Sequence, residues 1–172
     1  MRVLESAPIK QKPDKARAII FDREQNVVVV DYDGCLMFPG GKLDDGEIAR
    51  TAVTREVKEE LGLIISDGQK LFTFRQNRKN YPERDGTITP QRLVETDYFL
   101  FYQPIIEFGE RQLTNKEKLG KVVVKKVRLG KLLNFITEHQ SDNERWPFFE
   151  QEIMTVAKRL VESAVQLEEM KY

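Results

Sequence analysis

Apolar residues near the start of the chain fall into two short runs of the kind that form β-strands. Residues 16–21 and 26–32 are rich in β-branched and aromatic side chains, and the polar residues Asp22 to Gln25 separate them. A short polar link between two such runs is typical of a β-hairpin. Residues 27–30 are consecutive valines, which predicts a strand that is buried on both faces.

Two segments carry apolar residues at the spacing of an α-helix. In residues 47–61 the apolar positions form one ridge, made of Ala49, Val53, Val57 and Leu61. Gly62 follows at the position where a glycine commonly ends a helix. Residues 148–170 combine a continuous apolar stripe with many charged residues. This pattern predicts an amphipathic helix that packs against the rest of the fold or against a partner chain.

The remaining segments add strands and one short helix. Further strands are expected at residues 36–38, 70–75, 92–102 and 121–127, and a short helix is expected at residues 129–139. Pro39-Gly40-Gly41 is expected to break the first of these strands, and residues 76–90, which are basic and rich in turn formers, predict a loop. Strands mixed with two long helices predict a layered α/β (α+β) domain.

Length, composition and charge exclude several classes of protein. The 172 residues suffice for one domain, and a hydrophobic content of 40% suffices for a core. Lys and Arg balance Asp and Glu at 28 each, which disfavours a nucleic-acid partner and an electrostatic membrane anchor. The lone Cys35 cannot form an intrachain disulfide, and no apolar run is long enough to span a membrane. We therefore expect one soluble, cytoplasmic domain over residues 1–172, with the polar residues 1–15 as a leader.

Three glutamates on the first long helix are the strongest candidates for chemistry. On a helical wheel Glu60 falls within the apolar ridge, Glu56 lies at its edge, and Glu59 lies further round. A helix rich in Glu and Lys is usually a solvated face, but a carboxylate on a buried face is costly unless it is paired or binds a cation. Converging carboxylate oxygens suit Mg²⁺ or Mn²⁺ better than zinc. Arg55, one turn before Glu59, can orient them.

The residues around these glutamates resemble the signature of the Nudix hydrolase family. That signature is Gly, five residues, Glu, seven residues, Arg-Glu, an aliphatic residue, any residue, Glu-Glu, any residue, Gly and an aliphatic residue. This chain matches every fixed position, with Gly41, Glu47, Arg55, Glu56, Val57, Glu59, Glu60, Gly62 and Leu63. At ordinary residue frequencies, the probability that the signature matches by chance at any one starting position is about one in 10⁹. One departure is Leu36, where many members carry an aromatic residue ahead of the Pro-Gly-Gly turn.

This resemblance implies a Nudix-type α-β-α sandwich with a mixed β-sheet. It also implies Mg²⁺-dependent hydrolysis of a nucleoside diphosphate linked to a group X, which yields a nucleoside monophosphate and phosphorylated X; Mn²⁺ is expected to substitute. The metal ligands implied by motif position are the Gly40 carbonyl, Glu56, Glu59 and Glu60. Arg55, Glu56 and Glu59 are the implied catalytic residues, and Glu47 resembles the family's structural glutamate, which braces the loop.

Candidates outside the motif lie on the later strands and in the expected loop. We take Arg75, Arg78 and Tyr81 as substrate-binding candidates, because the basic loop could grip phosphates, although a merely solvated loop fits as well. Some relatives that cleave dinucleoside polyphosphates have a tyrosine at about the distance of Tyr81 from the motif. Glu95 and Asp97 share one face of their strand. One of them could supply a further metal ligand or the general base, but a solvated strand edge is the simpler interpretation.

An aromatic cluster, Trp146, Phe148 and Phe149, opens the last helix. It fits a hydrophobic staple of the core better than a site for stacking a base. His139 and Cys35 belong to no motif and are expected to be structural or surface residues.

Two other functions remain compatible with the motif. A non-catalytic sensor of a nucleotide derivative could keep the fold, but such sensors usually lose motif acids and none is lost here. An isomerase or an RNA-end-processing enzyme could use the same scaffold, although the neutral charge disfavours RNA. The group X, the nucleobase and the oligomeric state stay open, and a homodimer is compatible with the chain.

Overall fold

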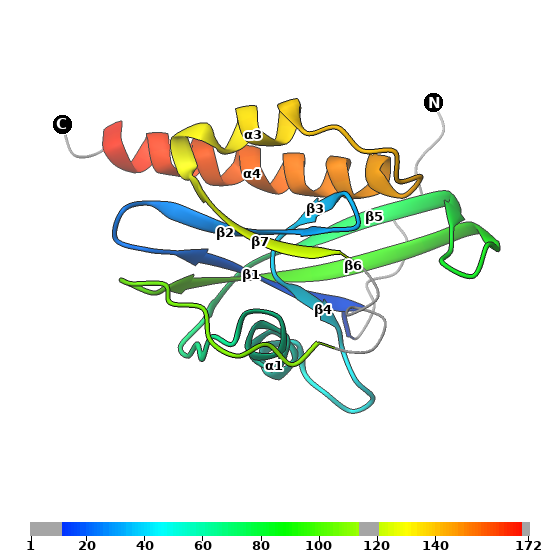
Figure 1. Ribbon diagram of the computed structural model, residues 1–172, viewed down its shortest axis with the longest axis horizontal. Coiled ribbons are helices and arrows are strands. Elements are labelled where there is room, and N and C mark those ends of the chain that lie inside the picture. The colour runs from blue at the N-terminus through cyan, green and yellow to red at the C-terminus, as the bar shows by residue number, and fades with distance from the viewer. Residues whose placement is uncertain (1–11, 114–120, 170–172) are drawn as a thin grey trace, which may run out of the picture.

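The computed structural model describes residues 12–113 and 121–169, in which one mixed β-sheet lies between two helical layers (Figure 1). The strands are β1 (Lys15–Phe21), β2 (Asn26–Tyr32), β3 (Cys35–Met37), β4 (Gly40–Lys42), β5 (Gln69–Pro82), β6 (Ile88–Tyr102) and β7 (Val122–Arg128). The helices are α1 (Ala49–Leu61), α3 (Leu132–Glu138) and α4 (Trp146–Glu169), and a short 3-10 turn, η1, spans Leu129–Lys131. Helices α3 and α4 cover one face of the sheet and α1 covers the other, which confirms the predicted α-β-α sandwich.

Strand β1 is the centre of this sheet. The strand order is β3-β2-β1-β6-β5, with β4 paired to β1 and β7 paired to β2. The β1–β6 pair is parallel, whereas the other strand pairs are antiparallel. In the β1–β4 register Ala16 lies opposite Gly41 and Arg17 opposite Gly40. The glycines that precede α1 are therefore fixed against the middle of the sheet.

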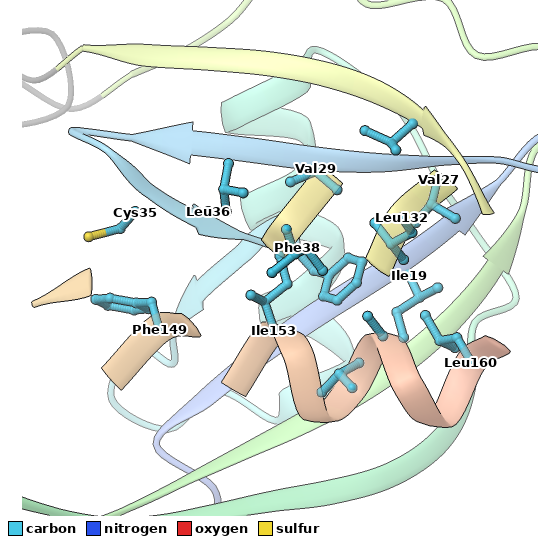
Figure 2. Close-up of a cluster of buried hydrophobic side chains, with 14 of the residues drawn as sticks. Ile19, Val27, Val29, Cys35, Leu36, Phe38, Leu132, Phe149, Ile153 and Leu160 are labelled. Atoms are coloured by element: carbon cyan, nitrogen blue, oxygen red, sulfur yellow. The ribbon is translucent and has the colours of Figure 1, made fainter. Parts of the chain in front are cut away.

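The valine run of β2 is buried on both faces, as predicted. Val27 and Val29 belong to the core under α3 and α4, whereas Val28 and Val30 belong to the core under α1. The first of these cores is shown in Figure 2, where Ile153 of α4 lies among side chains of the sheet and the β3–β4 link. Alternating side chains of one strand thus join both halves of the sandwich.

Helix α4 docks on the sheet through its apolar stripe, which confirms the predicted amphipathic helix. The stripe includes Phe149, Ile153, Val156 and Leu160, all of them buried in the core. Met170, the last residue of the predicted helix, lies outside the described residues. No helix in the described part of the chain is both long enough and apolar enough to cross a membrane.

The predicted loop at residues 76–90 is wrong. Strands β5 and β6 continue through most of it as one long antiparallel hairpin that turns between Pro82 and Ile88. The reason is visible in the burial pattern, because Gln76 and Arg78 are buried while Asn77 is exposed. This alternation is that of a strand, and the basic composition concealed it.

Two smaller expectations also need correction. Gly40–Lys42 does not simply break a strand, because it forms β4 against β1. The leader ends earlier than predicted, since Lys15 opens β1 and the Asp14 backbone N–H donates to the Glu95 carbonyl at 2.8 Å. Residues 1–11 of that leader lie outside the described residues.

Candidate active site

Arg55 of α1 connects the helix to the loop that precedes it. Its Nε and Nη2 donate to the two carboxylate oxygens of Glu47, both at 2.9 Å, and Nη2 also donates to the Lys42 carbonyl at 3.1 Å. Hydrogen bonds from Arg55 and from the Asp44 backbone lower the pKa of Glu47 to about 2. Glu47 is therefore an anion across the physiological range, and the two-point ion pair braces the turn between β4 and α1.

The same guanidinium also contacts two of the motif glutamates. Its Nη1 donates to Glu56 Oε1 at 3.0 Å and to Glu59 Oε2 at 3.3 Å. The hydrogen bond to Glu47 and the charge of Glu56 raise the pKa of Arg55 above its ordinary value. Arg55 thus stays cationic and holds three carboxylates in fixed positions, as the sequence predicted for Glu56 and Glu59.

Glu56 approaches the sheet closely because residue 41 is a glycine. A Cβ atom at Gly41 would lie 2.6 Å from both Cδ and Oε1 of Glu56. At Gly40 the φ angle is +146°, and a Cβ atom there would collide with the Ala16 carbonyl oxygen. Both glycines are therefore required by the packing of this turn.

A cavity of about 1100 Å³ opens beside these glycines. Gly40, Gly41, Glu56 and Glu60 line one side of it. Glu60 is only 9% exposed, which agrees with its position on the apolar ridge of the helical wheel. Glu59, by contrast, is 29% exposed in its side chain and is held by Arg55. Glu47 lines the cavity as well, so the cavity meets the motif through three carboxylates and the backbones of Gly40 and Gly41.

The donors on this wall fit a divalent cation of the magnesium type. Among the described residues, no three His, Cys, Asp or Glu side chains are placed so that they could hold a metal ion together. Mg²⁺ is usually held by one or two carboxylates, while water and substrate phosphates supply the other ligands. Glu56 and Glu60 on one wall of an open cavity match that kind of site.

The substrate-binding candidates divide between two places. Arg78 and Tyr81 line the same cavity as the motif glutamates Glu56 and Glu60. Arg75 instead forms an ion pair with Glu95, with 3.5 Å between Nε and Oε1. Of the three residues, the structure therefore brings two to the cavity.

Glu95 and Asp97 are buried, so the interpretation as a solvated edge is wrong. They are 3% and 6% exposed, because β6 lies between β1 and β5 instead of at the edge of the sheet. Asp97 accepts a hydrogen bond from Thr73 Oγ1 at 2.6 Å and lies 3.4 Å from Lys70 Nζ. Each carboxylate therefore has a cationic partner on β5.

Sequence reasoning missed two cationic residues of β1 that also line the cavity, Lys15 and Arg17. Burial, together with the charges of Arg17 and Arg78, lowers the pKa of Lys15 to about 7. The missed signal was a pair of basic residues at alternate positions of an otherwise apolar strand. Such a spacing places both side chains on one face of the sheet.

The aromatic residues at the start of α4 behave largely as predicted. Trp146 and Phe149 are buried in the core, and Phe149 also reaches the cavity. Phe148 is half-buried, with its ring edge-on to Tyr81 at 5.0 Å between centroids. Leu36, the departure from the family pattern, is fully buried in the same core.

His139 and Cys35 take structural positions, as expected. The Nε2 atom of His139 lies 2.7 Å from the Gly34 carbonyl oxygen, which ties α3 to the β2–β3 turn. Burial raises the pKa of Cys35 to about 11. The thiol therefore stays protonated at neutral pH and is a poor nucleophile.

Comparison with known proteins identifies the family. The profile of the NUDIX domain matches residues 11–118, well over half of the chain. An 8-oxo-dGTP diphosphatase from Proteus vulgaris is 31% identical over 86 residues, which are 46% of this chain and 74% of that protein.

Solved structures support the same fold. A mutant of the pyrophosphohydrolase BsRppH from Bacillus subtilis has a TM-score of 0.56 at 15% identity, covering 94% of this chain and 89% of that chain. A NUDIX hydrolase from Nitrosomonas europaea has a TM-score of 0.50 at 19% identity, covering 76% and 82% respectively. At such identities the likeness concerns the fold alone. Together with the profile match and the complete motif around Arg55, it leads to one conclusion: the chain belongs to the Nudix hydrolase family, whose members are pyrophosphohydrolases acting on phosphoanhydride bonds.

Proposed function

We propose that this chain hydrolyses a nucleoside diphosphate linked to a group X, with Mg²⁺ as cofactor and Mn²⁺ as a substitute. The products are a nucleoside monophosphate and phosphorylated X. The observation that carries this proposal is the cavity wall formed by Glu56 and Glu60 beside the backbone of Gly41. The diphosphatase from Proteus vulgaris suggests a nucleoside triphosphate as the simplest candidate, in which X is a phosphate.

The proposed metal ligands are Glu56, Glu59, Glu60 and the Gly40 carbonyl. A bound divalent cation would neutralise the diphosphate and lower the pKa of an attacking water. Glu56 and Glu60 already face the cavity, whereas Glu59 contacts Arg55. The donor set therefore suits a hard cation that also takes ligands from the substrate.

The chain's own residues would then position the reaction. Arg55 fixes Glu56 and Glu59 in position, because its guanidinium donates to the two carboxylates at 3.0 and 3.3 Å. Water adds to one phosphorus atom, its proton passes to a motif glutamate, and the phosphoanhydride bond to the leaving phosphate breaks. We assign that proton to Glu56, because Glu56 lines the cavity whereas Glu95 and Asp97 do not.

Two of the β5 residues are proposed to contact the substrate directly. Arg78 and Tyr81 both line the cavity, and the Arg78 Cζ atom lies 4.5 Å from the centroid of the Tyr81 ring. Arg75 would act only through its ion pair with Glu95.

The setting in which this activity takes place is also a proposal. We expect residues 12–169 to act as one cytoplasmic domain on a small nucleotide, without a membrane or a nucleic acid, because both helical layers pack on the same sheet. A homodimer is also compatible with the proposal, because the described residues of a single chain line the cavity.

The test is a substrate screen with purified protein and Mg²⁺. Nucleoside triphosphates including 8-oxo-dGTP, nucleotide sugars, dinucleoside polyphosphates and ADP-ribose would be compared by release of monophosphate or diphosphate. We expect turnover of at least one class, its loss with a chelator, and its recovery with Mg²⁺ or Mn²⁺. Tight binding without turnover of any class would instead support the nucleotide sensor.

A further inference from the structure

A second group of charged side chains lines the cavity on the other side of β1 from α1. We propose that Lys15, Arg17 and Arg78 form an anion subsite that takes a further phosphate group of the substrate, separate from the diphosphate that is hydrolysed. This rests on the proposed function, since the two sites share one cavity.

Strand geometry places Lys15 and Arg17 together. Lys15, Arg17 and Ile19 occupy every second position of β1, and Ile19 belongs to the core under α3 and α4. All three side chains therefore lie on the face of the sheet opposite α1. In register, Arg17 lies beside Tyr98 of β6, another residue of that core.

Arg78 of β5, like Lys15, lies close to the aromatic ring of Phe149. The Lys15 Nζ atom lies 5.5 Å from the centroid of the Phe149 ring, and the Arg78 Cζ atom lies 5.3 Å from the same centroid. Arg78 also lies over Tyr81 on its other side. The cations therefore approach one another around Phe149, at the wall of the cavity.

These side chains have hydrogen-bond donors left over. Arg17 is 3% exposed, and its Nη1 donates to the Phe38 carbonyl at 2.8 Å. Its Nε atom is buried and has no hydrogen-bond partner among the described residues. Arg78 is 6% exposed and donates from Nε to Gln76 Oε1 at 2.9 Å. Since a guanidinium carries five N–H donors, both arginines can still serve a ligand.

The charges in this group do not balance. The charged groups with the largest effect on Lys15 are three cations, Arg17, Arg78 and Lys42, and one carboxylate, Glu152 of α4. Glu152 is 4% exposed and accepts a hydrogen bond from the Tyr98 hydroxyl at 3.0 Å. Buried charges are stable when they are paired, so an excess of cations favours an anionic ligand over a neutral one.

A phosphate group meets these requirements better than a nucleobase does. Guanidinium groups bind phosphate oxygens in pairs, and a neutral base would leave the excess charge uncompensated. The diphosphate itself is expected beside Glu56 and Glu60, so this subsite takes a different group. At about 1100 Å³ the cavity is larger than the 300–1000 Å³ typical of small-molecule sites, which leaves room for that group.

Lys15 gives the subsite a measurable signature. Because its pKa is lowered to about 7, only part of the population carries the proton just above neutral pH. A bound anion favours the charged form, offsetting the burial and the charges of Arg17, Arg78 and Lys42, while Glu152 acts in the same direction as the ligand. Anion binding should therefore take up protons.

The experiment is calorimetric titration with inorganic phosphate at pH 7.5 in a chelator, in two buffers of different ionisation enthalpy. Without a divalent cation the motif carboxylates repel phosphate, so a signal reports the cationic group and is independent of hydrolysis. We expect binding with net proton uptake in the wild type, and at least tenfold weaker binding without uptake in Lys15→Met.

A matched control is Lys125→Met. Lys125 of β7 also lies over a phenylalanine, with 5.4 Å from Nζ to the Phe135 centroid, but it does not line the cavity. This variant should bind phosphate like the wild type. Melting curves in the chelator check that Lys15→Met and Lys125→Met fold. Arg78→Met provides a second test of the subsite. Equal phosphate binding by the wild type, Lys15→Met and Arg78→Met, or none by the wild type, overturns the subsite.

A second titration links the subsite to the substrate. A nucleoside 3′,5′-bisphosphate should bind the wild type at least tenfold more tightly than the 5′-monophosphate, and Lys15→Met should remove that difference. Phosphate binding without this preference overturns the assignment to a substrate phosphate. A failed hydrolysis screen with normal phosphate binding would instead count against the proposed function alone.

Discussion

The backbone of Gly41 and the carboxylate of Glu56 lie so close together that no side chain fits between them. A Cβ atom at Gly41 would stand 2.6 Å from Glu56 Cδ, well inside van der Waals contact. Gly41 is in β4, which pairs with the central strand β1, and Glu56 is in α1. This contact couples the position of the glutamate to the sheet and places its carboxylate at the cavity.

Replacing this glycine should displace the carboxylate without unfolding the protein. In Gly41→Ala the new methyl group pushes Glu56 away from β4, and a shift of about 1 Å can cost about 10²-fold in rate. We expect turnover to fall by about that factor while the melting temperature changes by only a few degrees. Activity and melting curves of this variant provide the check, and unchanged turnover would show that the close contact has no catalytic role.

The Glu47–Arg55 ion pair predicts a dependence of stability on pH. Its folded-state pKa of about 2 lies below the ordinary value of 4.5, so the ionised form stabilises the fold at higher pH. At pH 6 the wild type should be about 1–2 kcal/mol more stable than Glu47→Gln. The difference should shrink as the pH falls from 4.5 towards 2. Urea denaturation of both proteins at several pH values measures this, and a constant difference would contradict the ion pair.

Lys15 predicts a second pH dependence, in a higher pH range, in which the charged form of the side chain destabilises the fold. The folded state binds this proton less tightly than the unfolded state, since the pKa falls from 10.5 to about 7. The cost of burying Lys15 is therefore fully present below pH 7 and disappears as the pH approaches 10.5. Without ligand, Lys15→Met should be more stable than the wild type by about 1–3 kcal/mol at pH 6.5, and the gain should shrink towards pH 10. Denaturation curves of the two proteins would show an equal gain at both pH values if Lys15 has an ordinary pKa.

Replacing Val57 tests how the packing of α1 against the sheet contributes to stability. Val57 is fully buried between α1 and the sheet, and Val57→Ala should lower the free energy of unfolding by about 1–3 kcal/mol. Because the motif carboxylates are unaffected, turnover at low temperature should stay within about twofold of the wild type. Chemical denaturation and activity at 20 °C, measured on the same sample, separate the two effects.

The residues of α1 show why much of this site is readable from sequence. The helical period alone predicted that Glu60 lies on the buried ridge. In the structure Glu60 is 9% exposed and lines the cavity. The valines of β2 likewise predicted a strand between two cores. In both cases the pattern is local, so a few neighbouring residues determine which face is buried.

Lys15, Arg17 and Arg78 show where local pattern fails. Basic residues at strand spacing look like a solvated face or a loop until the partner strands are known. The parallel β1–β6 pair and the long β5–β6 hairpin bring Arg17 and Arg78 to one cavity from positions about sixty residues apart. The residue pattern within a single strand cannot predict that these side chains meet, because their proximity depends on the order of the strands in the sheet. Glu95 was misjudged for the same reason, since its burial follows from the place of β6 inside the sheet.

Turnover by Glu56→Gln tests the central claim most directly. This change keeps the volume and one oxygen but removes the charge that would hold a cation and accept the proton. With the substrate found by the screen and saturating Mg²⁺, we expect turnover about 10²- to 10⁴-fold below the wild type. The melting temperature without metal should change by only a few degrees, because Arg55 keeps its ion pair with Glu47 when Glu56 loses its charge. Wild-type turnover in this variant would contradict α1 as the catalytic element and, with it, the proposed enzyme mechanism.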